Sequence, residues 1–312
     1  MLLTVTLNPA IDRTLSVPGF AAGRTNRAVG GRVDAGGKGI NVARAAHRLG
    51  CPVMALGFLA PTNGALILQA LAAEGIPCDF VDVPGQTRTN LKIKDPETGV
   101  ETEINEPGFR VEPDQIRSVE EKVAAHARER CVVAFSGSLP PGAPEDIYAR
   151  LIRIAADRGA RTVLDSGGAA LRNGIAAGPD LVKPNRAEAA ELLGRSLEDD
   201  SDLGEAIQGL LACGARRAVI SLGPGGAAAG DGHGLWRAWA PAVQVRSTIG
   251  AGDAMVAALA CAMHGGLPLP DALRMATAAG CAAAATEGSA APELRDVEAL
   301  LPRVRVAPLT RV

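Results

Sequence analysis

The amino-acid sequence predicts an α/β protein in which helices cover both faces of a mainly parallel sheet. From about residue 113 onward, short apolar segments alternate with longer segments of helical periodicity. Such repeated strand–helix units favour parallel pairing, because each helix returns the chain to the starting edge of the sheet. In addition, polar residues follow most of the predicted strands, at the edge where α/β proteins bind ligands.

Composition limits the classes of function. The chain has 312 residues, of which 47% are hydrophobic and 21% charged, and its formal net charge is −2. This length suits one large domain, and the lack of a basic excess argues against nucleic-acid or membrane binding. Six cysteines without a C-x-x-C motif and four scattered histidines predict reduced thiols and no metal cluster. The N-terminus lacks the basic region of a signal peptide and no apolar run reaches membrane-spanning length, so we expect a cytoplasmic protein.

The first part of the chain predicts two strand–helix pairs and a hairpin. Residues 2–7 and 53–59 are short apolar strands, and residues 39–49 and 63–74 carry apolar residues at helical spacing. In NLKIKDPETGVETEIN, residues 90–105, apolar and polar residues alternate on both sides of a turn sequence. This alternation indicates an antiparallel hairpin with one exposed face, which is typical of a lid or an edge.

The remaining segments continue the strand–helix series without a repeat or an interdomain linker. Predicted strands lie at 131–135, 161–164, 180–183 and 217–221, with a Gly-rich hairpin at 226–240 and a candidate strand at 243–247. Predicted helices lie at 113–128, 144–158, 168–176, 185–193, 202–212, 251–264, 270–285 and 293–300.

Polar side chains cluster at the ends of six of these predicted strands. They are Asn8 and Asp12, Ser136 and Ser138, Asp165, then Lys183, Asn185 and Glu188, then Ser221, and finally the run from Ser247 to Asp253. Each of them alone fits an ordinary polar loop. Together they are expected to meet at one edge of the sheet, which favours a ligand site there.

The stretch GAGD, residues 250–253, has two interpretations. Asp253 at a helix start is compatible with simple N-capping. Alternatively, the small residues Gly250, Ala251 and Gly252 let backbone N–H groups converge on a phosphate, while Asp253 accepts the proton of an attacking hydroxyl. Phosphoryl transfer also requires cations, which Lys183 and a metal held near Glu188 would supply. The sequence GGKGIN at 36–41 fits neither a dinucleotide-binding fingerprint nor a P-loop.

Candidate residues for an acceptor lie nearer the N-terminus. Asp12 and Asn41 can hydrogen-bond the hydroxyl groups of a sugar. Arg27 and Arg88 can bind a second, non-reacting phosphate, because the planar guanidinium group matches phosphate geometry. For Arg88, a solvated loop arginine is an equally good interpretation.

Eight motifs in order carry a family resemblance across essentially the whole chain. They are TLNPAID, GGKGINVARA, TRTN, SGSLPPG, LDSGGAAL, LVKPNRAE, VISLGPGG and STIGAGDAMV. In these the sequence resembles the PfkB, or ribokinase-like, carbohydrate kinases, in particular the branch of 1-phosphofructokinase, tagatose-6-phosphate kinase and minor bacterial 6-phosphofructokinase. The resemblance implies one kinase domain over residues 1–312, a ribokinase-like three-layer α/β sandwich. It further implies a small β-sheet lid formed by insertions at about 10–35 and 86–108, ATP and Mg²⁺ as cofactors, and a homodimer through the lid.

The resemblance also implies a role for each matching residue. Asp253 matches the catalytic base, and Gly250, Ala251 and Gly252 match the anion hole. Asn185 and Glu188 match an N-x-x-E motif linked to phosphate and Mg²⁺, with Glu188 reaching the ion through water. Positions on the nucleotide side are Lys183, Ser221, Gly223, Gly226 and Thr248. Positions on the sugar-phosphate side are Asp12, Gly37, Asn41, Arg88 and Ser138, and Arg27 matches a basic lid position.

The implied activity is ATP-dependent phosphorylation of a ketohexose phosphate. Lys38 in GGKG and the stretch TEINEPG, residues 102–108, favour conversion of fructose 1-phosphate to fructose 1,6-bisphosphate. Tagatose 6-phosphate or fructose 6-phosphate as substrate is the alternative within the family. A non-catalytic sugar-phosphate sensor on the same fold is a third hypothesis.

Overall fold

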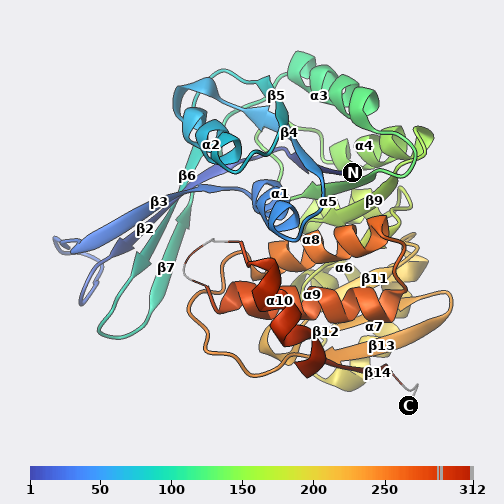
Figure 1. The fold of residues 1–312 in the computed structure, drawn as a ribbon. Coiled ribbons are helices and arrows are strands. Elements are labelled where there is room, and N and C mark those ends of the chain that lie inside the picture. Colours follow the sequence, from blue (N-terminus) through green and yellow to red (C-terminus); the bar gives the residue numbers. More distant parts are fainter. Residues whose placement is uncertain (287, 289–290, 310–312) are drawn as a thin grey trace.

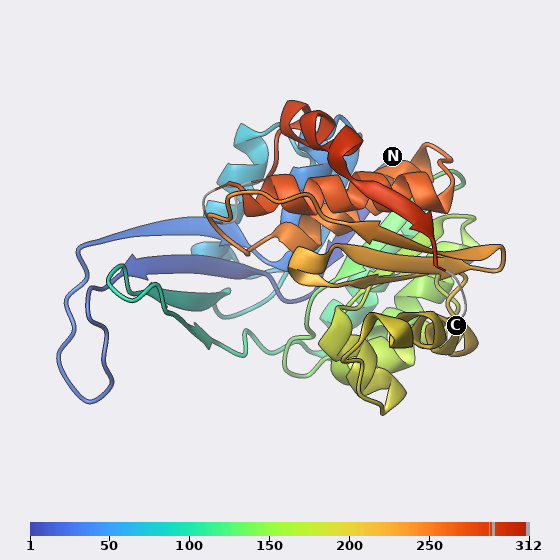
Figure 2. The ribbon, with the colours of Figure 1, turned by 90° about the horizontal axis from the view of Figure 1, so that it is seen from below.

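The protein consists of a large α/β body and a small sheet that projects from it (Figures 1 and 2). The structure is a computed structural model that describes residues 1–286, 288 and 291–309. The ten-stranded sheet of the body runs, from edge to edge, through β14 (Arg305–Pro308), β13 (Gly234–Trp239), β12 (Ala227–Asp231), β11 (Ala218–Ser221), β10 (Leu181–Val182), β9 (Arg161–Asp165), β8 (Val132–Ser136), β1 (Leu2–Thr6), β4 (Val53–Leu59) and β5 (Cys78–Asp82).

The prediction of a mainly parallel sheet is confirmed. The seven strands from β11 to β5 pair in parallel, whereas β12, β13 and β14 add an antiparallel edge. The chain first builds outward from β1 to β4 and β5, and then returns to add β8 and β9 on the other side of β1. Sheets of this kind bind ligands at the carboxyl ends of the strands, at the topological switch point where the strand order reverses.

The small sheet is assembled from two separate segments of the chain. Its strands are β3 (Gly30–Gly36), β2 (Ala10–Ser16), β6 (Arg88–Lys94) and β7 (Glu101–Asn105), in that order. β2 and β6 pair in parallel across the join, and each outer strand is antiparallel to its neighbour. The hairpin predicted at residues 90–105 is therefore β6–β7, and the segments 10–35 and 86–108 both contribute strands.

Two layers of helices cover the body sheet, each with its own hydrophobic core. On one face lie α1 (Lys38–Arg48), α2 (Pro61–Ala73), α8 (Ala251–His264), α9 (Leu269–Ala284) and α10 (Leu294–Leu300). On the other lie α3 (Pro113–His126), α4 (Ile147–Asp157), α5 (Gly168–Ile175), α6 (Arg186–Leu193) and α7 (Leu203–Ala212). None of the described helices is long and apolar enough to cross a membrane.

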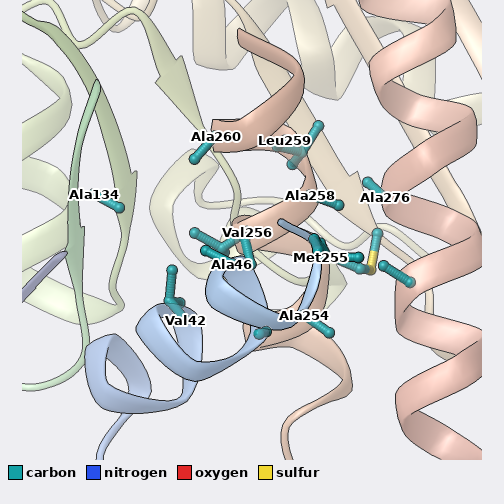
Figure 3. Close-up of a cluster of buried hydrophobic side chains, with 14 of the residues drawn as sticks. Val42, Ala46, Ala134, Ala254, Met255, Val256, Ala258, Leu259, Ala260 and Ala276 are labelled. Atoms are coloured by element: carbon teal, nitrogen blue, oxygen red, sulfur yellow. The ribbon is translucent and has the colours of Figure 1, made fainter. Parts of the chain in front are cut away.

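α8 is the central helix of its layer, between α1 and α9 (Figure 3). Most of its residues are buried on all sides, and many of them are alanines, which let neighbouring helices approach closely. Val42 and Ala46 of α1 and Ala276 of α9 lie around it. Among its buried residues only Asp253, in the first turn, carries a charge. The packing therefore fixes the position of this carboxylate.

The predicted strand at 243–247 is wrong. Residues 240–248 form neither a strand nor a helix, and this segment is tied to the body through Arg246 N and Ser247 N, which both donate to the carbonyl of Ala284. The neighbour of β13 in the sheet is β14, near the end of the described chain. Because β14 occupies the position beside β13, the apolar residues of the 243–247 segment have no strand to pair with.

Candidate active site

The predicted site residues of the body gather where parallel strands end and helices begin. Ser136 ends β8, Asp165 ends β9, Lys183 directly follows β10 and Ser221 ends β11. α6 begins here directly after β10, and the first turns of α1 and α8 reach the same edge, where Lys38 contacts Asp165 and Gly252 lies near Lys183. Helix N-termini favour anions, so the location suits a phosphorylated ligand.

A buried carboxylate lies between two lysines at the centre of this edge. Asp165 is 1% exposed, with Lys183 Nζ 3.1 Å from its Oδ1 and Lys38 Nζ 3.4 Å from its Oδ2. Burial raises the pKa of Asp165, but Lys183 and Lys38 outweigh it and hold that pKa below the ordinary value of 3.8. In turn Asp165 raises the pKa of Lys38. The two ammonium groups therefore carry one positive charge more than the carboxylate between them.

Asp165 had no role in the sequence prediction, although it was recognised as a strand-end residue. Its contact with Lys183 follows from the register of β9 and β10, in which Leu164 lies beside Val182, so that the next residues of both strands are neighbours. The register between two strands depends on how they pair in the folded sheet. The contact between Asp165 and Lys183 could therefore be predicted only from a correct strand order.

Asp253 is buried beside the start of α1. Asn41 Nδ2 donates a hydrogen bond of 2.8 Å to Asp253 Oδ2, and the residue is only 7% exposed. Burial, together with the negative charge of Asp165, raises the pKa of Asp253 to about 6. A carboxylate with a pKa in this range can both remain ionised near neutrality and accept a proton during a reaction.

The interpretation of Asp253 as a helix cap is wrong. The N-cap of α8 is Gly250, whose φ of 77° lies in the left-handed region that favours glycine, and Asp253 is the third residue of the helix. A Cβ atom added to Gly252 would lie 3.9 Å from Lys183 Nζ, so the first turn of α8 borders the lysine pair. The backbone of 250–252 and the Asp253 carboxylate thus face the same charged region.

Asn185 and Glu188 form a reciprocal capping box at the start of α6. Asn185 Oδ1 accepts from the backbone N–H of Glu188, and Glu188 Oε2 accepts from the backbone N–H of Asn185, both at 2.8 Å. The second carboxylate oxygen, Oε1, lies 3.9 Å from Lys38 Nζ. One oxygen of Glu188 therefore stabilises the helix while the other faces the lysine pair.

The donor set at this edge fits a magnesium ion held together with phosphates. In the described part of the chain, both oxygens of Asp165 are buried and accept no hydrogen bond beyond their ion pairs with Lys38 and Lys183. Glu188 Oε1 is directed at Lys38 as well. No group of three potential protein ligands occurs among these residues. Mg²⁺ typically uses one or two carboxylates plus water and substrate phosphates, which matches such a set.

The small sheet contributes a second group of polar residues. Asn90 Nδ2 donates to Asp12 Oδ1 at 2.9 Å, because Asp12 and Asn90 lie opposite each other on β2 and β6. Burial raises the pKa of Asp12. A Cβ on Gly36, in β3, would overlap the Asp12 carboxylate, so a larger residue there would displace that side chain. Asn90 was contained in the TRTN motif but received no role from the sequence.

Arg88 joins the small sheet to the loop after β1. It donates to the carbonyl groups of Asn8 and Glu106, each at 3.3 Å, and Asn8 Nδ2 in turn donates to Ser138 Oγ at 3.3 Å. Gly37 immediately precedes α1, and a Cβ there would lie 3.0 Å from Pro9. The structure thus links Arg88 to Ser138 through Asn8.

The predicted nucleotide-side residues are arranged less uniformly. Ser221 pairs with Asn185 in an isolated parallel bridge, which aligns the end of β11 with the start of α6. Gly223 and Gly226 lie in the turn after Ser221, whereas Thr248 is exposed in the irregular 240–248 segment. Arg27 is exposed in the loop between β2 and β3, which extends away from the body (Figure 2). The structure therefore does not bring Arg27 to the other residues.

The model of the family described as "pfkB family carbohydrate kinase" matches residues 5–296 of the chain. The chain belongs to this family. PfkB relatives include the 1-phosphofructokinase of Rhodobacter capsulatus, which is 41% identical over 99% of this chain and 98% of its own. The ATP-dependent 6-phosphofructokinase isozyme 2 of Escherichia coli K12 is 34% identical over 92% and 93%.

The resemblance and the fold class predicted from the sequence are confirmed by these comparisons. The solved tetrameric inhibited form of phosphofructokinase-2 from Escherichia coli matches with a TM-score of 0.89 and 32% identity, covering 97% of this chain and 98% of that chain. The body and the small sheet therefore form the ribokinase-like architecture of PfkB kinases.

Proposed function

We propose that this PfkB protein is an ATP-dependent kinase that converts fructose 1-phosphate to fructose 1,6-bisphosphate. The observation that carries the proposal is the buried Asp253 carboxylate, placed at the start of α8 beside Lys38 and Lys183. Relatives named 1-phosphofructokinase, at 33 to 41% identity over most of the chain, support the choice of substrate.

In this proposal Asp253 accepts the proton of the C6 hydroxyl as that oxygen attacks the γ-phosphorus of ATP. The backbone N–H groups of residues 250–253 and the ammonium group of Lys183 stabilise the negative charge of the transferring phosphoryl group. The backbone donors are already in place before reaction, because the packing of α8 fixes them, and Asp165 holds Lys183. The Asn41 hydrogen bond holds the base in its orientation.

The phosphate already on the sugar is held at the junction with the small sheet. Arg88, with Lys38, supplies positive charge, and Asp12, Gly37, Asn41 and Ser138 position the sugar. On the other side Ser221, Gly223, Gly226 and Thr248 border the nucleotide, with Asn185 and Glu188 at its phosphates. Mg²⁺ would be held near Glu188 through water and near Asp165, and it neutralises phosphate charge when bound.

The substrate is tested by a coupled ADP-release assay with fructose 1-phosphate, tagatose 6-phosphate and fructose 6-phosphate at matched concentrations. We expect fructose 1-phosphate to give the highest kcat/KM. Equal or faster reaction with fructose 6-phosphate overturns the assignment of fructose 1-phosphate as the substrate. Fructose 6-phosphate is the second candidate because one relative is named 6-phosphofructokinase isozyme 2. Binding of all three sugars without ADP release would favour the non-catalytic sensor.

The base is tested by Asp253→Asn. The amide is nearly isosteric and can still contact Asn41, but it cannot accept a proton, so kcat should fall by about 10²–10⁴. Because the charges that hold the sugar phosphate remain, its dissociation constant, measured by calorimetry, should change only a few-fold. Turnover within tenfold of the unmodified enzyme would remove Asp253 from this role.

We further propose a cytoplasmic homodimer that pairs through the small sheet acting as a lid. The sheet has a polar face, with Asp12, Asn90 and Lys92, and an opposite face with Val33, Arg13, Leu91 and Ile104 in one cross-strand row. Val33 and Ile104 are 48% and 53% exposed. A second copy of the sheet would cover these apolar side chains.

A further inference from the structure

The carbonyl group of Gly137 accepts hydrogen bonds from two side-chain hydroxyl groups. Tyr148 Oη donates to it at 3.1 Å, and Ser166 Oγ donates to it at 2.9 Å. Gly137 directly follows β8, Tyr148 lies in the first turn of α4, and Ser166 directly follows β9. Three separate elements therefore converge on one peptide group at the edge of the sheet that carries the candidate active site. The two hydroxyl groups, called the hydroxyl pair below, have no part in the phosphoryl transfer proposed above.

Both members of the hydroxyl pair are firmly placed. Tyr148 is completely buried and its ring packs beside that of Phe135, with the ring centroids 6.1 Å apart, and Ser166 is 2% exposed. Burial and the negative charge of Asp165 raise the pKa of Tyr148, so its phenol group stays protonated and can donate. A buried hydroxyl group that loses its acceptor is destabilising, so each of these side chains favours one position of the Gly137 carbonyl.

The Gly137 carbonyl belongs to the peptide group that leads into Ser138. Because a peptide group is planar, a fixed carbonyl also fixes the direction of the Ser138 N–H and the position of its Cα. Gly137 has a φ of 104°, in the region that favours glycine, and glycine has more conformational freedom than any other residue. The preceding side is fixed separately, since Gly137 N donates to the Asp165 carbonyl at 2.9 Å and Asp165 pairs with Ser136 in the sheet. The segment that depends on the hydroxyl pair is therefore the one that begins at Ser138.

We propose that Tyr148 and Ser166 are positioning residues for the sugar phosphate, which orient the Gly137–Ser138 peptide and so place Ser138 on the sugar-phosphate side of the site. Ser138 Oγ accepts a hydrogen bond from Asn8 Nδ2 at 3.3 Å, so a displaced Ser138 would also lose this contact. The two hydroxyl groups share one acceptor. The loss of either leaves the other in place, whereas the loss of both releases the peptide.

The test removes the hydroxyl groups and measures KM for each substrate in the coupled ADP-release assay. Tyr148→Phe and Ser166→Ala each delete one donor, and each should raise KM for fructose 1-phosphate about twofold. The double variant should raise it at least about tenfold, more than the roughly fourfold product of the single effects, because neither hydroxyl group then holds the carbonyl. KM for ATP should stay within about twofold and kcat within about threefold, since Asp165 keeps its place in β9. An unchanged KM for fructose 1-phosphate in the double variant, or an equal rise in both KM values, overturns the proposal.

A matched control separates positioning from a loss of stability. Thr162 is a buried residue near the amino end of β9, away from the site, and its Oγ1 donates to Asp180 Oδ2 at 3.4 Å. Thr162→Val removes this hydroxyl group, so it should lower the urea midpoint and leave both KM values unchanged. A rise in KM for fructose 1-phosphate as large as that in the double variant would make the effect one of general destabilisation and contradict the proposal. If the double variant does not fold, the single variants decide, and an unchanged KM for fructose 1-phosphate in both overturns the proposal.

The route through Ser138 is tested in a Ser138→Ala background. There the added Tyr148→Phe and Ser166→Ala changes should raise KM for fructose 1-phosphate less than about threefold, because the group that they position is already missing. The same factor as in the unmodified background contradicts a route through Ser138. The KM readout rests on the proposed kinase function, which the unmodified enzyme tests by itself, since absence of ADP release refutes that function alone. The dissociation constants of fructose 1-phosphate and fructose 6-phosphate, measured by calorimetry, then carry the same comparison of variants.

Discussion

At the scale of single residues, the site contains two buried carboxylates whose pKa values move in opposite directions. Asp165 contacts two ammonium groups, which hold its pKa below the ordinary range despite burial. Asp253 accepts a hydrogen bond from the neutral amide of Asn41. Burial and the negative charge of Asp165 raise its pKa to about 6. Environments that separate two carboxyl groups in this way separate their roles, with one fixed as an anion and the other ready to take a proton.

This difference predicts the acid side of the pH profile. If Asp253 must be ionised to act, kcat/KM for the sugar phosphate should rise with unit slope as pH increases and level off above about 6. Removing the negative charge of Asp165 lowers the pKa of Asp253, so Asp165→Asn should shift this limb to lower pH. Removing the Asn41 hydrogen bond raises that pKa, so Asn41→Leu should shift it to higher pH.

The opposite pH shifts expected for Asp165→Asn and Asn41→Leu serve as controls for each other. The phosphate group of the substrate also titrates near pH 6, but it is the same in all three enzymes. The measurement is the pH dependence of initial rates at low sugar phosphate, normalised to each plateau because both substitutions also lower the rate. Identical limbs in the three enzymes would assign the titration to the substrate and contradict the role of Asp253.

The residue-level prediction succeeded where a local pattern was sufficient. The position of Asp253 at the start of a buried helix follows from GAGD and the apolar run after it. The partners of the site residues were not predictable in this way. Asp165 meets Lys183, and Asn90 meets Asp12, only through the register of neighbouring strands. The place of Arg27 depends on where the loop after β2 extends, which no periodic pattern determines.

At the scale of elements, α6 shows how one motif serves both folding and binding. Each residue of its capping box satisfies a backbone N–H that the first turn of a helix would otherwise leave unpaired. Glu188 does so with one oxygen only, which leaves the other directed at Lys38. The structural and functional interpretations of N-x-x-E are therefore compatible, and substitutions can separate them.

Glu188→Gln should raise the Mg²⁺ concentration needed for half-maximal rate at fixed ATP with little change in stability. The amide oxygen still accepts the Asn185 N–H, but the negative charge that attracts a divalent cation is gone. By contrast, Asn185→Ala removes the cap and should lower the free energy of unfolding by about 1 kcal/mol. Urea denaturation and Mg²⁺ titration of the rate check both. An unchanged Mg²⁺ requirement in Glu188→Gln would confine Glu188 to a structural role.

The elements that the sequence predicted well are those with a clear period or a fully buried apolar run. The central strands and most helices fall within a few residues of their expected bounds. β5 and β14 were not predicted, because β5 is partly exposed and contains Asp79 and Asp82, and β14 is a short edge strand. The segment 243–247 has strand-like composition but no partner strand. Pairing in the sheet, which is non-local, decided each of these cases.

At the scale of the whole molecule, the small sheet has two faces of different chemistry. Its polar face looks toward the body across a cavity that Lys92 and Lys94 line together with Gln244 and Ser247. Its other face carries the exposed Val33 and Ile104. A sheet with one face turned to a ligand cleft and an apolar face turned outward is expected to bury the latter against another surface.

If the protein is the proposed homodimer, the variant Val33→Lys with Ile104→Lys should be monomeric. Four lysines would meet at a two-fold interface, and their repulsion and desolvation oppose association. The masses are measured by sedimentation velocity. Leu294→Lys, at a similarly exposed leucine on α10, is the control and should remain dimeric. A monomeric unmodified protein, or a larger assembly that the double substitution leaves intact, would contradict pairing through the sheet.

The Asn41–Asp253 contact has a consequence for refolding. It joins a helix that follows the first strands to a helix near the end of the chain, across 212 residues. Contacts of such long sequence separation form late, because closing a long loop must precede them. In a renaturation experiment the helical signal should therefore recover before enzymatic activity. Regain of turnover would then report the last step of folding, in which α8 packs against α1 and the Asn41–Asp253 contact forms.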